Sequence, residues 1–267
     1  MDDAAASALL KSRALIAVSG PDWRSFLQGL LTQDVESLAP GEARFGALLT
    51  PQGRLLHDLF VVSQGGEACW LDVEGEHRAA IIQRLLMYRL RAKVEVAADE
   101  AAVSAHWNGP ASAQGLYRDP RLPELGWRGY GVRATGPEAE YDAHRLRLGV
   151  PGPADWGSDR TYPIEADFDL LNGIDFKKGC FVGQETTSRM KRRGQIKSRM
   201  IPIVFDGPAP AFGSEVVAGD LRAGEVLSGL EGRAMALLRL DRAAGSPLTV
   251  DGRTVAVHTP AWMTTAP

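Results

Sequence analysis

The chain has 267 residues, of which 45% are hydrophobic and 24% are charged, with 29 glycines and 16 prolines. This length is sufficient for two modest domains, and this composition is typical of a soluble globular protein with many turns. A formal net charge of −3 excludes a general electrostatic field for nucleic acid or an anionic membrane, and no run approaches the roughly 20 apolar residues of a membrane span.

The N-terminus and the cysteines limit the cellular setting. Met1, Asp2 and Asp3 are followed by alanines, without the basic region and apolar core of a signal peptide, so a cytoplasmic location is expected. Cys69 and Cys180 are too few for a disulfide framework or a four-cysteine metal site within one chain. The five histidines show no metal-ligand spacing, so no metal site is predicted.

The first elements along the chain are a strand and a helix. Residues 13–18 form a short apolar strand, and Ser19-Gly20-Pro21-Asp22 form a turn that starts a helix with proline near its first position. Apolar residues then recur at helical spacing, which predicts a stripe facing the core rather than a cofactor: Trp23, Phe26, Leu27, Leu30 and Leu31.

A three-stranded meander is predicted next, over residues 45–49, 55–62 and 68–73, with proline and glycine in its turns. Cys69 lies in the third strand and is expected to be packed. Asp58 interrupts the second strand, where a carboxylate needs a hydrogen-bonded partner or a ligand; an edge position facing solvent is the alternative. A helix over 76–89 and a strand over 93–97 complete an order typical of α+β domains.

The rest of the chain divides into a short-strand region, a helix, a loop and a series of strands. We expect shorter strands over 101–134, a helix over 138–148 and a loop over 153–163. Six short strands separated by turn signals suggest a small antiparallel barrel: 201–205, 215–218, 223–228, 234–240, 248–250 and 255–258. The sequence therefore predicts a two-part α+β protein, 1–196 and 197–267, joined near 194–198.

The stretch from Asn172 to Glu185 concentrates unusual chemistry. Cys180 follows Lys177 and Lys178 and precedes residues 184–190, whose composition is compatible with a helix. Nearby cations and a helix N-terminus both stabilise a thiolate, so we expect Cys180 to react as one near neutral pH. The alternative is a small packed residue, since free cysteine is among the most buried residue types.

Lys178 to Glu185, Lys-Gly-Cys-Phe-Val-Gly-Gln-Glu, resembles the signature of the YgfZ family, folate-binding proteins related to the T-protein (aminomethyltransferase) of the glycine cleavage system. Further stretches resemble the family's motifs in the same order: Phe26-Leu27-Gln28-Gly29 with Thr32 and Asp34, Leu49 to Arg54 with Asp58, Arg145 with Gly149 and Pro151, and Arg189-Met190-Lys191 with Arg193-Gly194. The resemblance covers most of residues 13 to 260. It implies a T-protein-like folate-binding fold whose C-terminal antiparallel β-barrel closes a folate channel.

The resemblance also implies a function and its residues. The chain would bind tetrahydrofolate, or a one-carbon derivative, and support assembly or repair of iron–sulfur clusters in client enzymes, including tRNA-modifying ones. Cys180 and Asp58 would be catalytic, and the folate would contact Asp58, Glu165, Gln184, Arg189 and Lys178. Asp58 looks like the T-protein aspartate that approaches the reactive folate nitrogen. Glu165 looks like the acid that grips the pterin ring, whose two parallel N–H donors suit a carboxylate.

Two other functions are considered. A tetrahydrofolate-dependent aminomethyltransferase is disfavoured because T-proteins lack the Lys-Gly-Cys loop, and because His57 stands where they often carry a second acid. An RNA-binding module would use the six cations of residues 189–199, which can equally be a solvated face or a landing site for a folate glutamate tail. That run lacks interleaved aromatics, so no stable nucleic-acid complex is expected. The expected partners are folate and iron–sulfur client proteins, with no membrane, for a monomeric chain; any turnover would be one-carbon transfer.

Overall fold

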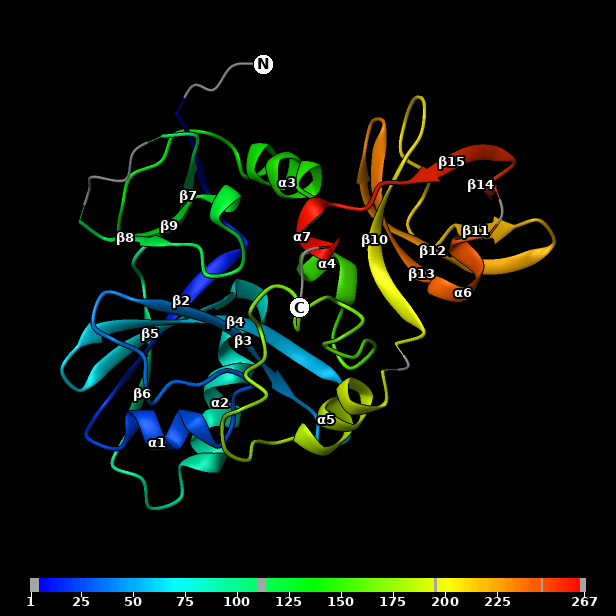
Figure 1. Cartoon of the computed structure of the whole chain (residues 1–267). Coiled ribbons are helices and arrows are strands. Elements are labelled where there is room, and N and C mark those ends of the chain that lie inside the picture. The colour runs from blue at the N-terminus through cyan, green and yellow to red at the C-terminus, as the bar shows by residue number, and fades with distance from the viewer. Residues whose placement is uncertain (1–4, 110–113, 195, 246, 265–267) are drawn as a thin grey trace.

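A five-stranded antiparallel sheet organises the first part of the chain in the computed structural model, which describes residues 5–109, 114–194, 196–245 and 247–264 (Figure 1). Its strand order is β3-β4-β5-β2-β6, with bounds β2 Arg13–Ser19, β3 Ala43–Leu49, β4 Leu55–Gly65, β5 Ala68–Glu74 and β6 Glu95–Asp99. The helices α1 (Trp23–Gln28) and α2 (Arg78–Arg89) interrupt the strands, and a 3-10 turn, Gly75–His77, precedes α2. The predicted strand–helix–three strands–helix–strand order is confirmed.

The two faces of this sheet bury different side chains because successive residues of a strand point to opposite faces. Ile16 of β2 and Leu59 of β4 share one core with α1 and α2, and this core contains the whole predicted stripe from Trp23 to Leu31. Leu15 and Phe60, each one residue away from these, belong to a second core on the other face. This second core extends under the loop that carries Cys180, because Ile174 and Phe181 are part of it.

A smaller antiparallel sheet, β1-β7-β9-β8, lies beside the first one (Figure 1). Its bounds are β1 Ala6–Leu9, β7 Val103–Trp107, β8 Leu116–Arg118 and β9 Trp127–Tyr130, with a 3-10 turn at Pro123–Leu125. Two helices follow, α3 (Glu138–Arg147) and α4 (Pro153–Trp156). The prediction of a loop over 153–163 is therefore wrong for its first four residues, which form α4. Pro153 suits a first helical position, and the Asp155 carboxylate accepts the Gly152 N–H at 2.7 Å, which satisfies a donor of this first turn.

The last third closes into a six-stranded antiparallel barrel, as predicted, in the order β10-β13-β12-β11-β14-β15. The strands are β10 Ser198–Val204, β11 Glu215–Ala218, β12 Leu221–Leu230, β13 Arg233–Arg239, β14 Leu248–Val250 and β15 Arg253–Val257, with short helices α6 (Leu240–Ala243) and α7 (Ala261–Thr264). A separate core fills it. Within the described residues no helix is both long and apolar enough to cross a membrane.

Arg199 of β10 joins the barrel to the segment before the Cys180 loop. Its guanidinium is buried and donates to the Asp167 carboxylate at 2.7 Å and to the Asp169 carboxylate at 2.9 Å. Burial outweighs the attraction of Arg199 and raises the pKa of Asp167 to about 8. The run of cations over 189–199 is therefore not one solvated face, because its last member is internal. This weakens the RNA-binding alternative further.

The division into 1–196 and 197–267 remains a prediction, and residue 195 of its boundary lies outside the described residues. Exposed Gly194, in the left-handed region, ends α5 (Gln184–Arg193), and exposed Lys197 precedes β10. We expect limited proteolysis to cut first within 194–198, since exposed connections are the preferred sites of nicking. Denaturing electrophoresis and mass spectrometry should then show a larger N-terminal fragment. A first cut inside residues 13–97 would contradict this division.

Candidate functional site

The loop that carries Cys180 is held by the segment at the end of α1. The ammonium nitrogen of Lys178 donates to three backbone carbonyls, those of Gln28, Leu31 and Gln33, at 2.7, 2.7 and 2.9 Å. An ammonium group has three N–H donors, so all of them are used. The position of Cys180, two residues further along, is thereby tied to the end of α1.

A second set of bonds fixes the start of the same loop. The buried hydroxyl of Thr32 donates to the Gly173 carbonyl at 2.6 Å, and the Asp175 N–H donates to the Thr32 carbonyl at 3.0 Å. The Gln33 side-chain amide donates to the Asn172 carbonyl at 2.5 Å. Buried hydrogen bonds of this kind are costly to break because each would leave a polar group without a partner. These contacts have no signature in the local sequence, although Thr32 belongs to one of the motifs that resemble the family.

The turn after β3 packs against the point where α5 begins. A Cβ atom on Gly183, whose φ is +82°, would lie 2.5 Å from the Thr50 carbonyl oxygen. A Cβ atom on Gly53, whose φ is +84°, would lie 2.9 Å from Cβ of Thr186. Only glycine permits both this backbone conformation and this approach. Three stretches that are distant in the sequence, 28–34, 50–53 and 172–187, therefore meet around the Cys180 loop.

Cys180 itself is exposed, whereas Cys69 is fully buried in β5. Desolvation raises the pKa of the Cys69 thiol far above its usual range. Lys178, predicted to stabilise the Cys180 thiolate and to contact a folate, has its donors on carbonyls instead. Its desolvation lowers the pKa of its ammonium group to about 8. Of the two lysines, Lys177 is the one left exposed near the cysteine.

The difference between the two cysteines is directly measurable. We expect iodoacetamide to label Cys180 in the folded protein at neutral pH at least about tenfold faster than Cys69, because only an exposed sulfur with thiolate character reacts. Mass spectrometry of peptides after timed quenching gives both rates in one sample. Labelling in denaturant is the control, and the two rates should there become similar. Equal rates in the folded protein would contradict the burial of Cys69.

A hollow of about 470 Å³ lies beside α5 and is lined by Phe176, Gln184, Glu185, Ser188, Lys191 and Arg192. It includes Gln184, one of the predicted binding residues. Arg189, another of them, is exposed and forms an ion pair with Glu185 at 3.8 Å, which is a weak surface contact. The Lys191 nitrogen lies 3.6 Å from the Asp169 carboxylate, so this cation is also engaged.

Asp58 is far from solvent, and its partner is Arg13. The Arg13 guanidinium donates to Asp58 at 2.9 Å and to Asp72 at 2.7 Å. Asp72 also accepts from Arg128 at 2.7 Å and from the Tyr130 hydroxyl at 3.1 Å. The solvent-facing alternative for Asp58 is therefore wrong, and its carboxylate belongs to a buried ion-pair network. One oxygen of Asp58 has no hydrogen-bond partner among the described residues.

Asp58 and Glu165 are not brought together. Asp58 faces a cavity of about 50 Å³ that is also lined by Arg13, Arg121, Arg128 and Arg145, and Glu165 does not line it. Instead, the Glu165 carboxylate accepts the N–H of Tyr162 in its own turn, at 3.0 Å. Its backbone carbonyl accepts from Met200 of the barrel at 2.8 Å. Burial raises the pKa of Glu165.

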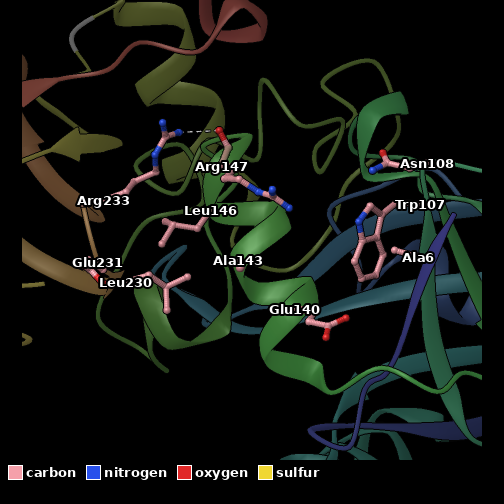
Figure 2. Close-up of a pocket in the computed structure, with 11 residues that line it drawn as sticks. Ala6, Trp107, Asn108, Glu140, Ala143, Leu146, Arg147, Leu230, Glu231 and Arg233 are labelled. Atoms are coloured by element: carbon pink, nitrogen blue, oxygen red, sulfur yellow. Dashed lines mark hydrogen bonds between the residues drawn. The ribbon is translucent and has the colours of Figure 1, made fainter. Parts of the chain in front are cut away.

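A larger hollow, about 660 Å³, lies at the seam between α3 and the hairpin that joins β12 to β13. Figure 2 shows α3 between Trp107 on one side and Leu230 and Arg233 of the barrel on the other. Arg233 donates to the Arg147 carbonyl at 2.7 Å across this seam. None of the predicted site residues lines this hollow. We therefore do not take it as the candidate functional site.

Two family models match separate parts of the chain. The GCVT N-terminal domain matches residues 10–118, and the CAF17 C-terminal beta-barrel domain matches residues 197–265. The fold is similar to the crystal structure of the glycine cleavage system aminomethyltransferase T from Bartonella henselae, with a TM-score of 0.78 over 97% of this chain and 86% of that one. At 18% identity this likeness shows the fold alone. The predicted T-protein-like fold with a C-terminal antiparallel barrel is confirmed.

Known proteins with similar sequences are named as iron–sulfur cluster assembly factors. The chain is 31% identical to the mitochondrial factor IBA57 of Homo sapiens, over 83% of this chain and 75% of that protein. It is 32% identical to the mitochondrial IBA57 homolog of Neurospora crassa, over 75% of this chain and 54% of that one. The chain thus spans about half the length of the fungal relatives it matches.

These relatives correct one expectation and refine another. They are named as mitochondrial, which contradicts the predicted cytoplasmic location. The missing basic and apolar regions at the N-terminus exclude a secretory signal peptide only, and mitochondrial transit segments have a different composition. The resemblance to the YgfZ family is confirmed at the coarser level of a CAF17- and GCVT-type family whose named members here are IBA57 proteins.

Proposed function

The chain belongs to the IBA57 family. From this premise we propose that it supports the assembly of iron–sulfur clusters in client proteins, and that the Cys180 loop contacts the cluster. One observation supports this role for the loop. Cys180 is exposed, while the backbone around it is held by bonds from Lys178 and Thr32. An exposed thiol on an anchored loop can present a soft ligand to iron without the loop having to order first.

The cysteine count indicates how the thiol would take part. Iron–sulfur clusters are usually held by four cysteine thiolates. Cys69 is buried, so Cys180 alone can supply sulfur from this chain. We infer that any cluster would be held between Cys180 and ligands from a second protein, either the client or a carrier. The cluster would then be transferred and not retained, and the anchored loop would set the orientation of the Cys180 sulfur toward it.

The test is made in cells that lack the chain. The specific activity of a [4Fe–4S] enzyme should fall and should return when the wild-type chain is expressed. An enzyme without a cluster is the control, and immunoblots show whether the client polypeptide is still made. Tracking a cluster-dependent tRNA modification in the same cells tests the narrower proposal that the clients include tRNA-modifying enzymes. Unchanged activity of every cluster enzyme would contradict the proposal.

Asp58 and Glu165, as the fold arranges them, do not form one pocket for tetrahydrofolate. Pockets for ligands of this size enclose about 300–1,000 Å³. The cavity next to Asp58 encloses about 50 Å³, and its arginines are paired with carboxylates of the same network. Glu165 lies outside it. We therefore assign no step to folate at Asp58 and Glu165, and the aminomethyltransferase alternative loses its basis in these two residues.

Calorimetry with tetrahydrofolate tests whether the chain binds folate through Asp58. We expect no saturable heat up to about 1 mM folate, which corresponds to a binding free energy weaker than about 4 kcal/mol. A reducing buffer keeps the folate intact, and a T-protein serves as the positive control. Saturable binding that Asp58→Asn weakens at least about tenfold would contradict this expectation and restore the folate site.

A further inference from the structure

A group of metal-ligating side chains lies at the end of β5, outside the site described above. Glu74 is the last residue of β5, and Glu76 and His77 follow in the 3-10 turn that leads into α2. One carboxylate oxygen of each glutamate and one ring nitrogen of His77 all lie within 4.8 Å of one another. The His77 Nε2 atom is 3.7 Å from Glu74 Oε2 and 3.4 Å from Glu76 Oε1.

These distances suit the ligands of a tetrahedral ion. Zinc binds imidazole nitrogen and carboxylate oxygen at about 2.0–2.2 Å, so two ligand atoms on a tetrahedron lie about 3.3–3.6 Å apart. The two measured pairs are at that separation or slightly beyond it. A small rotation of exposed Glu76 and half-buried Glu74 would bring their oxygens onto a common ion.

His57 of β4 stands beside this group as a fourth donor and its second imidazole. Its ring centroid is 5.0 Å from that of His77, and its buried Nδ1 atom has no hydrogen-bond partner among the described residues. An imidazole nitrogen without a hydrogen-bond partner is available to bind a metal ion.

The local charges favour a cation at this position. The Glu74 side chain is half-buried, and one of its carboxylate oxygens lies within 4.8 Å of one from Glu76. Across the described ranges, neither Glu74 nor Glu76 forms an ion pair with a lysine or arginine. Arg13, which lies opposite Glu74 on the neighbouring strand, is already paired with Asp58 and Asp72. A divalent ion would relieve the repulsion between the two glutamates.

We propose that Glu74, Glu76 and His77, with His57 as the fourth ligand, bind one divalent first-row transition metal ion. Two imidazole nitrogens and two carboxylates fit zinc, cobalt or iron(II) rather than calcium or magnesium, which take oxygen ligands. The sequence spacing gave no indication of this set, because His57 and His77 are brought together only by the turn after β5.

The experiment uses the full chain without a histidine tag. Calorimetry with Zn²⁺ should show one saturable site, and Co²⁺ should give the intense visible absorption of a tetrahedral nitrogen and oxygen site. Glu76→Gln and His77→Ala should each weaken Zn²⁺ binding at least about tenfold and remove the Co²⁺ spectrum. His57→Ala should weaken binding and change the spectrum. Glu76 is exposed, so its variant tests the site without risk to folding.

Two controls separate this site from other metal binding. His258→Ala removes an exposed histidine elsewhere and should leave both titrations unchanged. Cys180→Ser should also leave them unchanged, because the thiol is not among the proposed ligands. The proposal is overturned if the wild type shows no saturable Zn²⁺ binding, if Glu76→Gln binds as the wild type does, or if Cys180→Ser abolishes binding. A His57→Ala variant with unchanged affinity and spectrum overturns the assignment of the fourth ligand.

Discussion

Cells that carry only the Cys180→Ser variant should fail to restore iron–sulfur enzyme activity, although the variant folds as the wild type does. Cys180 is exposed, and no hydrogen bond in the described residues involves its side chain, so an oxygen in place of sulfur should change stability by less than about 0.5 kcal/mol. A serine hydroxyl does not ionise at neutral pH and does not bind iron as a thiolate does. We expect rescue to fall at least about tenfold, measured as the specific activity of a [4Fe–4S] enzyme.

The matched control is Cys69→Ala. Cys69 is buried in β5 and packs in the core under α1 and α2. Its replacement therefore removes some packing contacts but leaves the accessible thiol of Cys180 in place. This variant should rescue fully if it is expressed at the wild-type level. Full rescue by Cys180→Ser would show that the thiol is dispensable and would refute the mechanism proposed for the loop.

Much of the fold could be predicted from local patterns because each element has a strong one. The stripe from Trp23 to Leu31 has helical spacing, and every member is buried in one core. The barrel strands are short apolar segments separated by glycine turns, and β11 and β14 have the predicted bounds. Residues 153–156 were missed because four residues are too few to show a helical period.

The partners of the charged residues could not be predicted, because they depend on how the strands pair. Asp58 interrupts an apolar strand, and that pattern indicates a partner without naming it. The partner is Arg13, 45 residues away, which the strand order β4-β5-β2 brings to the same face of the sheet. Asp72 shows the same pattern between Leu71 and Val73 and was overlooked, although it lies at the centre of the network.

The partners of Lys178 could not be predicted for a similar reason. Its position two residues before Cys180 suggested that its charge would lie beside the sulfur. In the fold its ammonium group points to the end of α1, about 150 residues earlier in the chain, where carbonyls lack helical partners. Local sequence shows which residues are charged, but only the tertiary fold determines which acceptors they meet.

Replacing Asp72 with alanine should lower the free energy of unfolding by about 3–5 kcal/mol, a large part of the total for a domain of this size. Asp72 is fully buried and its carboxylate joins two arginines, Arg13 at 2.7 Å and Arg128 at 2.6 Å. Removing it would leave Arg128 buried with no acidic partner among the described ion pairs, while Arg13 would keep Asp58. An uncompensated buried charge is what makes breaking such a pair costly.

The stability lost in the Asp72→Ala variant should decrease as the pH falls. Burial works to raise the pKa of Asp72, but Arg128 and Arg13 outweigh it and the pKa is lowered. A lowered carboxylate pKa contributes stability that is present above the unfolded value of about 3.9 and is lost as pH falls through the folded value. Urea unfolding at pH 7 should show the full difference between wild type and Asp72→Ala, and the two curves should approach each other below about pH 4.

A double-mutant cycle separates the network from simple loss of packing. Arg128→Met keeps the bulk against Phe60, over whose ring the guanidinium lies at 4.0 Å, and removes the charge. If Asp72→Ala is costly because Arg128 is left unpaired, the double variant Asp72→Ala/Arg128→Met should be more stable than the sum of the single losses by about 1–3 kcal/mol. Glu42→Ala, which removes an exposed pair with Arg44 at 3.6 Å, is the matched surface control and should cost less than about 1 kcal/mol. Additive losses at Asp72 and Arg128, or a cost at Asp72 no larger than at Glu42, would mean that the buried charges are not energetically coupled.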